Sequence, residues 1–134
     1  MTGDDIAPKR AWRIAILAIY WMVCFTGTHL PPSPIVRLAG PIPDWLMHGA
    51  LFAGLGGLVA RVGGRTPMSR GRAARLYLLI IAYAALDEWT QPLVRRACEL
   101  SDWIADAVGG AIGMLLAIGW QARRVAATDE DGPA

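Results

Sequence analysis

The chain has no asparagine and only two cysteines among its 134 residues. Without asparagine it offers no acceptor for N-linked glycosylation. Cys24 and Cys98 do not have the spacing of a metal site, and two cysteines do not form a disulfide framework. We therefore expect both cysteines to act as small apolar residues.

The common catalytic signatures are also missing. The sequence contains no G-x-S-x-G nucleophile motif and no HExxH zinc motif. The glycines at 54, 56 and 57 do not form a dinucleotide fingerprint, because they follow no strand and position 59 is Val. A metal site that uses His48, carboxylates and His29 is conceivable, but no ligand motif supports it. The sequence therefore predicts no metal and no other cofactor.

Charge is scarce as well. Charged residues make up 18% of the chain and hydrophobic residues 54%, whereas a soluble domain has about 25% charged residues. Most of the charges cluster outside the apolar runs, which indicates a small integral membrane protein with one domain. Open strands cannot cross a bilayer, so the apolar segments must be helices. The four predicted spans are Trp12–Thr28, Trp45–Arg61, Arg75–Gln91 and Trp103–Gln121.

The basic residues predict the direction of these spans. Ten of the 13 Lys and Arg residues lie before or at the start of the first span, between the second and third spans or at the span ends that border this loop, or after the fourth span. This bias predicts cytoplasmic termini, and therefore an all-α membrane protein with a four-transmembrane-helix bundle. The first span resembles a signal peptide without a cleavage site, which indicates an uncleaved anchor. We expect a membrane domain over 12–122, flanked by disordered cytoplasmic segments over 1–11 and 123–134.

Small residues recur at a spacing of four in two spans. Gly49, Ala53 and Gly57 lie in the second span, and a second stripe lies in the fourth. Such stripes let membrane helices approach closely. They favour packing within the chain, although a homodimer remains an alternative. The stripe of the fourth span is Ala105, Gly109, Gly113 and Ala117.

Three spans carry polar side chains to the same depth, near the predicted outer face. Cap residues, helix ends, a structural clasp or headgroup anchors would each account for some of them. An acid beside a histidine can also serve general acid–base catalysis, with Glu88 and His48 as the pair. Arginines near them could hold a phosphate or carboxylate. The candidate ligand-binding residues are Asp44, His48, Asp87, Glu88, Gln91, Arg95, Arg96, Asp102 and Asp106.

Three motifs in this cluster resemble those of VanZ-like proteins. Asp44-Trp45-Leu46-Met47-His48 is similar to the family's D-K-x-x-H, and Asp87-Glu88-Trp89-Thr90-Gln91 to its D-E-x-x-Q. The segment that begins Asp102-Trp103-Ile104-Ala105-Asp106 and ends at Gly109 resembles D-x-x-x-N-x-x-G. The family's Lys is Trp45 here and its Asn is Asp106, while its outer-loop Arg corresponds to Arg95 or Arg96.

The resemblance implies a multi-pass protein of the bacterial cytoplasmic membrane. The family's namesake is linked to resistance to teicoplanin, a lipidated glycopeptide. We therefore expect a non-enzymatic envelope protein that binds a lipidated or amphiphilic ligand. The alternative is a membrane enzyme for an envelope lipid or lipid-linked precursor, with Glu88 and His48 as catalytic acid and base. Expected partners are membrane lipids and such amphiphiles, and no nucleic acid, because the arginine-rich loop reads as a topology determinant.

Overall fold

The fold is all-helical over the residues that the structure, a computed structural model, describes: 6–29, 42–63 and 68–130. No strand occurs in these ranges, which agrees with the all-α part of the predicted fold class. The elements are α1 (Ile6–His29), α3 (Asp44–Gly63), α4 (Arg70–Thr90), the 3-10 helix η2 (Gln91–Val94) and α5 (Leu100–Glu130).

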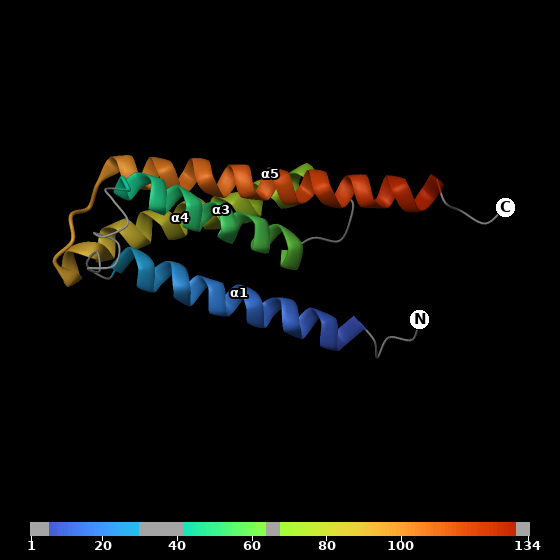
Figure 1. The fold of residues 1–134 in the computed structure, drawn as a ribbon, viewed down its shortest axis with the longest axis horizontal. Helices are drawn as coiled ribbons and strands as arrows, with labels where there is room; N and C mark the ends of the chain where they lie inside the picture. The colour runs from blue at the N-terminus through green and yellow to red at the C-terminus, as the bar shows by residue number, and fades with distance from the viewer. Residues whose placement is uncertain (1–5, 30–41, 64–67, 131–134) are drawn as a thin grey trace.

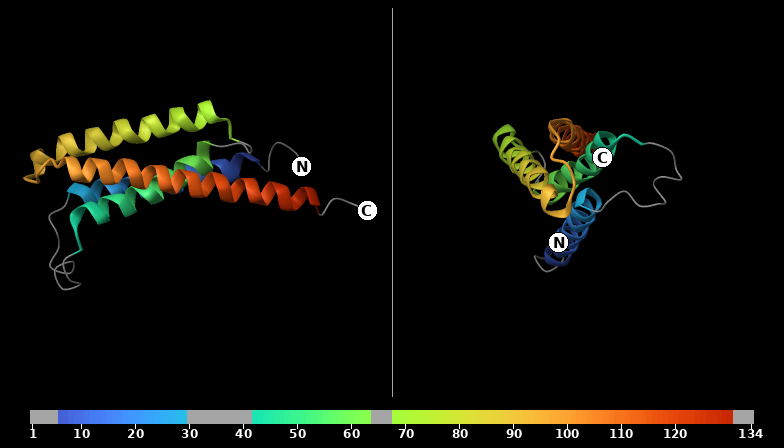
Figure 2. Two further views of the ribbon diagram at one scale, coloured as in Figure 1. Left: turned by 90° about the horizontal axis from the view of Figure 1, so that it is seen from above. Right: turned by 90° about the vertical axis from the view of Figure 1, so that its left-hand side faces the viewer.

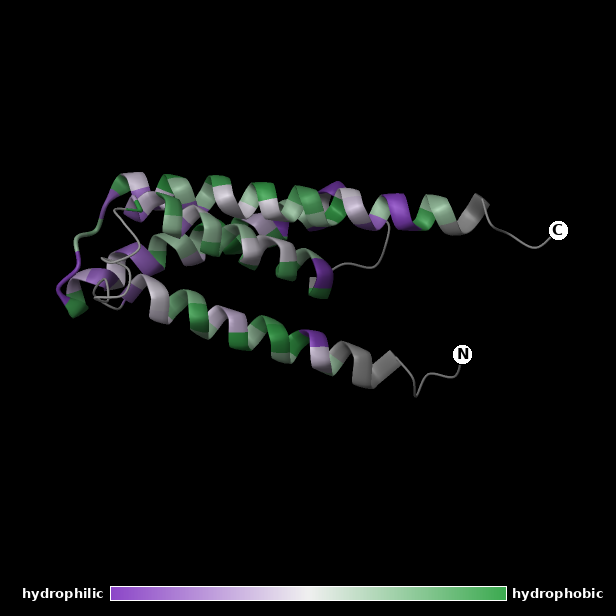
Figure 3. Cartoon of the chain, viewed as in Figure 1, coloured by the Kyte–Doolittle hydropathy of each residue, from purple (hydrophilic) through white to green (hydrophobic). Residues whose placement is uncertain are grey.

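Three of the helices are long and apolar enough to cross a membrane. The apolar stretches are Ala11–His29 in α1, Asp44–Val62 in α3 and Leu100–Ala127 in α5. Helix α4 has a suitable length of 21 residues, but charged residues at both of its ends lower its mean hydropathy. Figure 3 shows hydrophobic or near-neutral colouring along most of α1 and α5, and hydrophilic residues in the turn from η2 to α5.

The helices run side by side as an elongated bundle (Figure 1). Seen end-on, α3 lies between α1 and α5, and α4 stands beside the α3–α5 pair (Figure 2). The most extensive packing is between α3 and α5, while α1 packs mainly on α3. The last turn of α1, the first turn of α3, the end of α4 and the start of α5 therefore meet at one end of the bundle.

Glycines allow α3 and α5 to approach closely. A Cβ atom on Gly113 would clash with the backbone carbonyl of Ala53, and one on Gly109 would clash with that of Gly49. Gly56 approaches the carbonyl of Gly110 in the same way. The predicted packing of the two small-residue stripes within the chain is confirmed, since backbone approach of this kind is what such stripes permit.

Local sequence signals explain how α4 begins and ends. The side chain of Ser69 accepts a hydrogen bond from the Arg72 amide and caps the first turn. At the other end Pro92 cannot continue an α-helix, and the chain passes into η2. Arg95 ends η2 with a φ of 64°, a left-handed conformation that reverses the chain toward α5.

Both terminal helices extend beyond the predicted membrane domain. Helix α1 begins at Ile6 and α5 continues to Glu130, so parts of 1–11 and 123–134, predicted as disordered, are helical. Residues 1–5 and 131–134 lie outside the described ranges. The two cysteines are free thiols; Cys24 is fully buried and Cys98 is exposed.

Candidate functional site

In the described part of the chain, eight polar or charged side chains are buried at the end of the bundle where the four helices meet. Burial of a polar side chain costs free energy unless the side chain finds a hydrogen-bond partner, so eight buried polar groups in one place are unusual. Each helix contributes to this group, which we call the polar cluster. Its members are Thr28, His29, His48, Asp87, Glu88, Gln91, Asp102 and Asp106.

His48 is the hub of the polar cluster. Its Nδ1 atom lies 3.2 and 3.3 Å from the two carboxylate oxygens of Asp106, and 3.5 Å from Glu88 Oε1. Its Nε2 atom faces Asp102 Oδ2 at 3.9 Å. The imidazole from α3 therefore lies among carboxylates from α4 and α5, with only 1% of its surface exposed.

Glu88 is held by donors from its own end of the bundle. The Gln91 side-chain amide donates to Glu88 Oε1 at 2.8 Å. The backbone amide of Glu99 donates to Glu88 Oε2 at 3.0 Å. Both oxygens thus have a donor, which fixes the orientation of the carboxyl group toward His48.

Asp87 belongs to a second branch of the cluster. The hydroxyl of Tyr83 donates to Asp87 Oδ1 at 3.1 Å, and His29 Nδ1 lies 3.7 Å from the same oxygen. His29 is itself hydrogen-bonded to Thr90 Oγ1 through Nε2 at 3.0 Å and to Thr28 Oγ1 through Nδ1 at 3.1 Å. This branch connects the end of α1 to the end of α4.

Asp44 and Arg96 form an ion pair at the rim of the cluster. The Asp44 side chain is 55% exposed and that of Arg96 is 13% exposed. Arg95 is exposed on the surface of the η2–α5 turn. The structure thus distinguishes the two arginines that the sequence left open, because Arg96 is the one that contacts a predicted site residue.

Asp44 and Asp102 are not the N-cap residues of α3 and α5, which was the structural alternative for these two acids. The carbonyl of Pro43, and not Asp44, accepts the first backbone hydrogen bonds of α3. The carbonyl of Glu99 does the same for α5, and Asp102 is 3% exposed inside the cluster.

Most of the predicted site residues come together. His48, Asp87, Glu88, Gln91, Asp102 and Asp106 lie inside the cluster, whereas Asp44, Arg95 and Arg96 lie at its rim or on the surface. Sequence reasoning missed Thr28, Tyr83 and Thr90, and it mentioned His29 only as a metal candidate. The sequence could have indicated the part of α1 in the cluster, because the predicted topology places Thr28 and His29, at the end of α1, at the same depth as the other cluster residues.

The geometry allows two kinds of chemistry. The imidazole of His48, between Glu88 and Asp106, can accept or donate a proton. His48, Asp87, Glu88 and Asp106 also each offer a ligand atom within 4.8 Å of the others, a spacing that suits a metal ion. Free acceptors remain, because Asp87 Oδ2 and Gln91 Oε1 have no hydrogen-bond partner in the described part of the chain.

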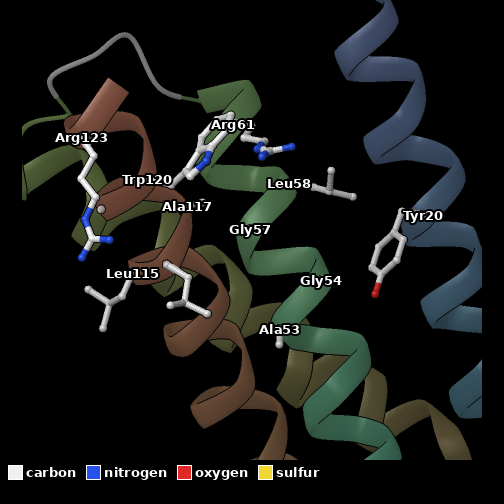
Figure 4. Close-up of a pocket in the computed structure, with 12 residues that line it drawn as sticks. Tyr20, Ala53, Gly54, Gly57, Leu58, Arg61, Leu115, Ala117, Trp120 and Arg123 are labelled. Carbon is white, nitrogen blue, oxygen red and sulfur yellow. The ribbon is translucent and has the colours of Figure 1, made fainter. Parts of the chain in front are cut away.

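A separate groove of about 890 Å³ lies toward the opposite end of the α3–α5 pair. Figure 4 shows Tyr20 of α1 on one side and Trp120 and Arg123 of α5 on the other, with Gly54 and Gly57 of α3 between them. The groove is mainly apolar, with arginines at one end. It shares no residue with the polar cluster.

The sequence model of the VanZ/LLP1 family matches residues 12–121. The chain belongs to the VanZ family. The match covers the helical bundle with the polar cluster, and the apolar helices agree with a membrane protein. No curated protein and no solved structure matched the chain.

Proposed function

We propose that this VanZ-family protein crosses the bacterial cytoplasmic membrane with four helices and has both termini in the cytoplasm. The arrangement of basic residues supports this topology. Arg61, Arg70, Arg72, Arg75 and Arg123 belong to helix ends at the end of the bundle away from the polar cluster. Positive residues favour the cytoplasmic side, so the polar cluster would lie near the outer face. Arg37 and Arg65 lie outside the described residues.

Helix α4 would be the fourth span. Its two acids, Asp87 and Glu88, are 1% and 3% exposed, so they would not meet lipid. Its outward surface carries large apolar side chains, including Leu78, Leu79 and Leu86. Acids that point into a bundle are tolerated in a membrane helix, whereas acids that face acyl chains are not.

The proposed function is to bind the polar end of an amphiphile in the outer polar cluster. The observation that carries it is the convergence of buried acceptors, two of them without a donor in the described residues. Unsatisfied buried acceptors favour a ligand rich in hydroxyl, amide or amine donors. Exposed apolar residues beside the cluster, such as Trp89, Leu93 and Leu100, would lie along the ligand's acyl chain.

This chemistry fits a lipidated glycopeptide such as teicoplanin or a lipid-linked envelope precursor. Both have a donor-rich head and a long acyl or prenyl tail. A contribution to glycopeptide resistance would then follow from capture of the antibiotic at the membrane surface.

The test is the binding of labelled teicoplanin to the purified chain in nanodiscs, compared between Glu88→Gln and Glu99→Gln. Both variants change one carboxylate to an amide, but the Glu99 side chain is exposed and only its backbone serves the cluster. We expect Glu88→Gln to weaken binding about 10-fold or more, because it changes a buried acceptor. Glu99→Gln should bind as the wild type does.

Equal binding by both variants would contradict the site. Mass spectrometry of lipids that co-purify with the same proteins extends the test to precursors. Wild-type protein that retains no donor-rich lipid and binds no teicoplanin would contradict the function.

A membrane enzyme is the second candidate, and the position of His48 favours it. Its Nδ1 atom lies within 3.5 Å of carboxylates on two helices, an arrangement suited to proton transfer during attack by a substrate hydroxyl or water. Under this hypothesis Glu88→Gln would retain the amphiphile but stop its conversion. Loss of binding and conversion together would favour the binding function.

A further inference from the structure

The buried acids of the polar cluster outnumber the cations that face them. Within the described ranges, two imidazoles make the ion-pair contacts of the four buried acids. His29 contacts Asp87, and His48 contacts Glu88, Asp102 and Asp106. Four ionised carboxylates against two protonated imidazoles would leave two negative charges uncompensated. Uncompensated charge in a buried site is costly. A divalent cation would supply the missing charge.

The ion pair at the rim does not change this balance. Arg96 contacts Asp44, so the pair adds one charge of each sign. The excess therefore belongs to the buried interior of the cluster.

The positions of the ligand atoms suit a metal ion. Metal–ligand bonds of about 2.0–2.2 Å place neighbouring ligand atoms about 3–4 Å apart. His48 Nδ1 already lies 3.2 Å from Asp106 Oδ1 and 3.5 Å from Glu88 Oε1. One atom from each of His48, Asp87, Glu88 and Asp106 lies within 4.8 Å of the others.

An unpartnered atom points independently to a ligand. Asp87 is 1% exposed, and its Oδ2 atom has no hydrogen-bond partner among the described residues. Its other oxygen accepts from Tyr83. A carboxylate with one oxygen oriented by a hydroxyl and the other free is typical of a metal ligand with its outer-shell support.

Glu88 has outer-shell partners too. Gln91 and the backbone of Glu99 orient Glu88. The Nε2 atom of His48 lies 3.9 Å from Asp102 Oδ2 and has no hydrogen-bond partner among the described residues. A metal on Nδ1 would leave Nε2–H on the side of Asp102, where a small approach would form the carboxylate–histidine–metal arrangement.

We propose that His48, Asp87, Glu88 and Asp106 bind one divalent first-row transition-metal ion. One imidazole with three carboxylates suits Zn²⁺, Mn²⁺ or Fe²⁺, whereas Ca²⁺ and Mg²⁺ prefer oxygen alone. The sequence predicted no metal because these ligands come from α3, α4 and α5 and form no local motif. Ion binding goes beyond the proposed function and needs no amphiphile.

The experiment measures metal binding to the full chain in detergent, purified with a tag that contains no histidine. After treatment with a chelator, the protein is titrated with Zn²⁺ or Mn²⁺, and bound metal per chain is counted by elemental mass spectrometry. We expect close to one ion per chain. His48→Ala and Glu88→Gln should each weaken binding about 100-fold, and Tyr83→Phe, which affects only the support of Asp87, about 10-fold.

Gly119→Ala is the control and should bind metal as the wild type does, because Gly119 is not part of the polar cluster and nothing lies within 4 Å of its Cβ position. Helix content and gel filtration show whether each variant is folded. A second readout is the rise in thermal unfolding temperature with added Zn²⁺, since an ion that binds only the folded state stabilises it. This rise should disappear in Glu88→Gln.

Three results would overturn the proposal: a wild-type protein that binds no metal, a His48→Ala variant that binds as tightly as the wild type, or Ca²⁺ bound as tightly as Zn²⁺. The amphiphile is absent from these measurements. Metal binding without teicoplanin or lipid binding would therefore reject the proposed function alone, and the reverse result would reject only the metal site.

Discussion

The two ends of the α3–α5 pair use the same glycine-rich packing for different purposes. At the end that would face outward in the proposed topology, here called the outer end, the helices enclose His48 and the buried carboxylates. At the opposite end, here called the inner end, they leave an apolar groove with Arg61, Trp120 and Arg123 among its lining residues. The comparison shows that close backbone contact in this bundle creates the framework, while the side chains at each end determine what can bind there.

The charged groups at the two ends also differ in how they are paired or solvated. The outer carboxylates are buried and share too few cations. The inner arginines are near the surface, where Arg61 and Arg124 lie over the Trp120 ring at 4.7 and 3.9 Å. Water and lipid headgroups can solvate the inner charges, whereas the outer ones depend on the protein and its ligand.

The largest expected effect comes from Gly113→Ala, which tests the shared framework. The new Cβ would clash with the backbone carbonyl of Ala53, and α3 and α5 would have to separate. We expect a loss of about 3 kcal/mol in the free energy of unfolding, at the upper end for overpacking. Gly119→Ala is the matched control, because nothing lies within 4 Å of its Cβ position. Equal denaturation curves for the two variants would contradict the packing.

Asp87→Asn should have opposite effects with and without metal. In metal-free protein it removes one excess negative charge and places an amide donor where Oδ2 lacked a partner. We expect a gain of about 1 kcal/mol in stability. With Zn²⁺ present the variant should be less stable than the wild type, because a ligand is lost. Thermal unfolding with chelator and with Zn²⁺ measures both, and destabilisation of the metal-free protein would contradict the charge imbalance.

Trp120→Leu tests whether the inner end is independent of the outer one. Removal of the ring eliminates the stacking of Arg61 and Arg124, with an expected cost of about 0.5–1 kcal/mol. Teicoplanin and Zn²⁺ affinities should not change, since the groove shares no residue with the polar cluster. A parallel loss of either affinity would show that the two ends are coupled.

Asp44→Asn should give the smallest change in stability. The Asp44 side chain is 55% exposed, and exposed ion pairs contribute about 0.5 kcal/mol. The variant removes the Asp44 carboxylate from the rim ion pair, so any effect should appear in amphiphile affinity and its salt dependence. A loss of stability as large as that of Gly113→Ala would mean that the rim pair is structural.

The sequence predicted much of the cluster because two simple rules act together. Helical periodicity places Asp102 and Asp106 on the packing face of α5. The arginine distribution predicts the direction of each span, and these directions place the two acids at the same depth as His48 and Glu88. The partners of these residues were harder to predict. The Glu99 backbone amide has no sequence signature, and Tyr83 contacts Asp87 one turn away within an otherwise apolar run.

His29 was underestimated for a different reason. Helix α1 reads as an isolated signal anchor, and its packing on α3 and η2 appears only in three dimensions. Arg95 and Arg96 could not be separated by sequence, because only the left-handed backbone at Arg95 decides which side chain turns toward Asp44.

The contrast between the two thiols provides a built-in reporter of orientation. Cys98 is exposed in the turn before α5, and Cys24 is sealed within the bundle. A maleimide dye that cannot cross membranes should therefore modify intact cells at a single native position if that turn faces outward. Protection of Cys98 in intact cells, followed by reaction after lysis, would reverse the proposed membrane orientation and place the buried acids on the cytoplasmic side.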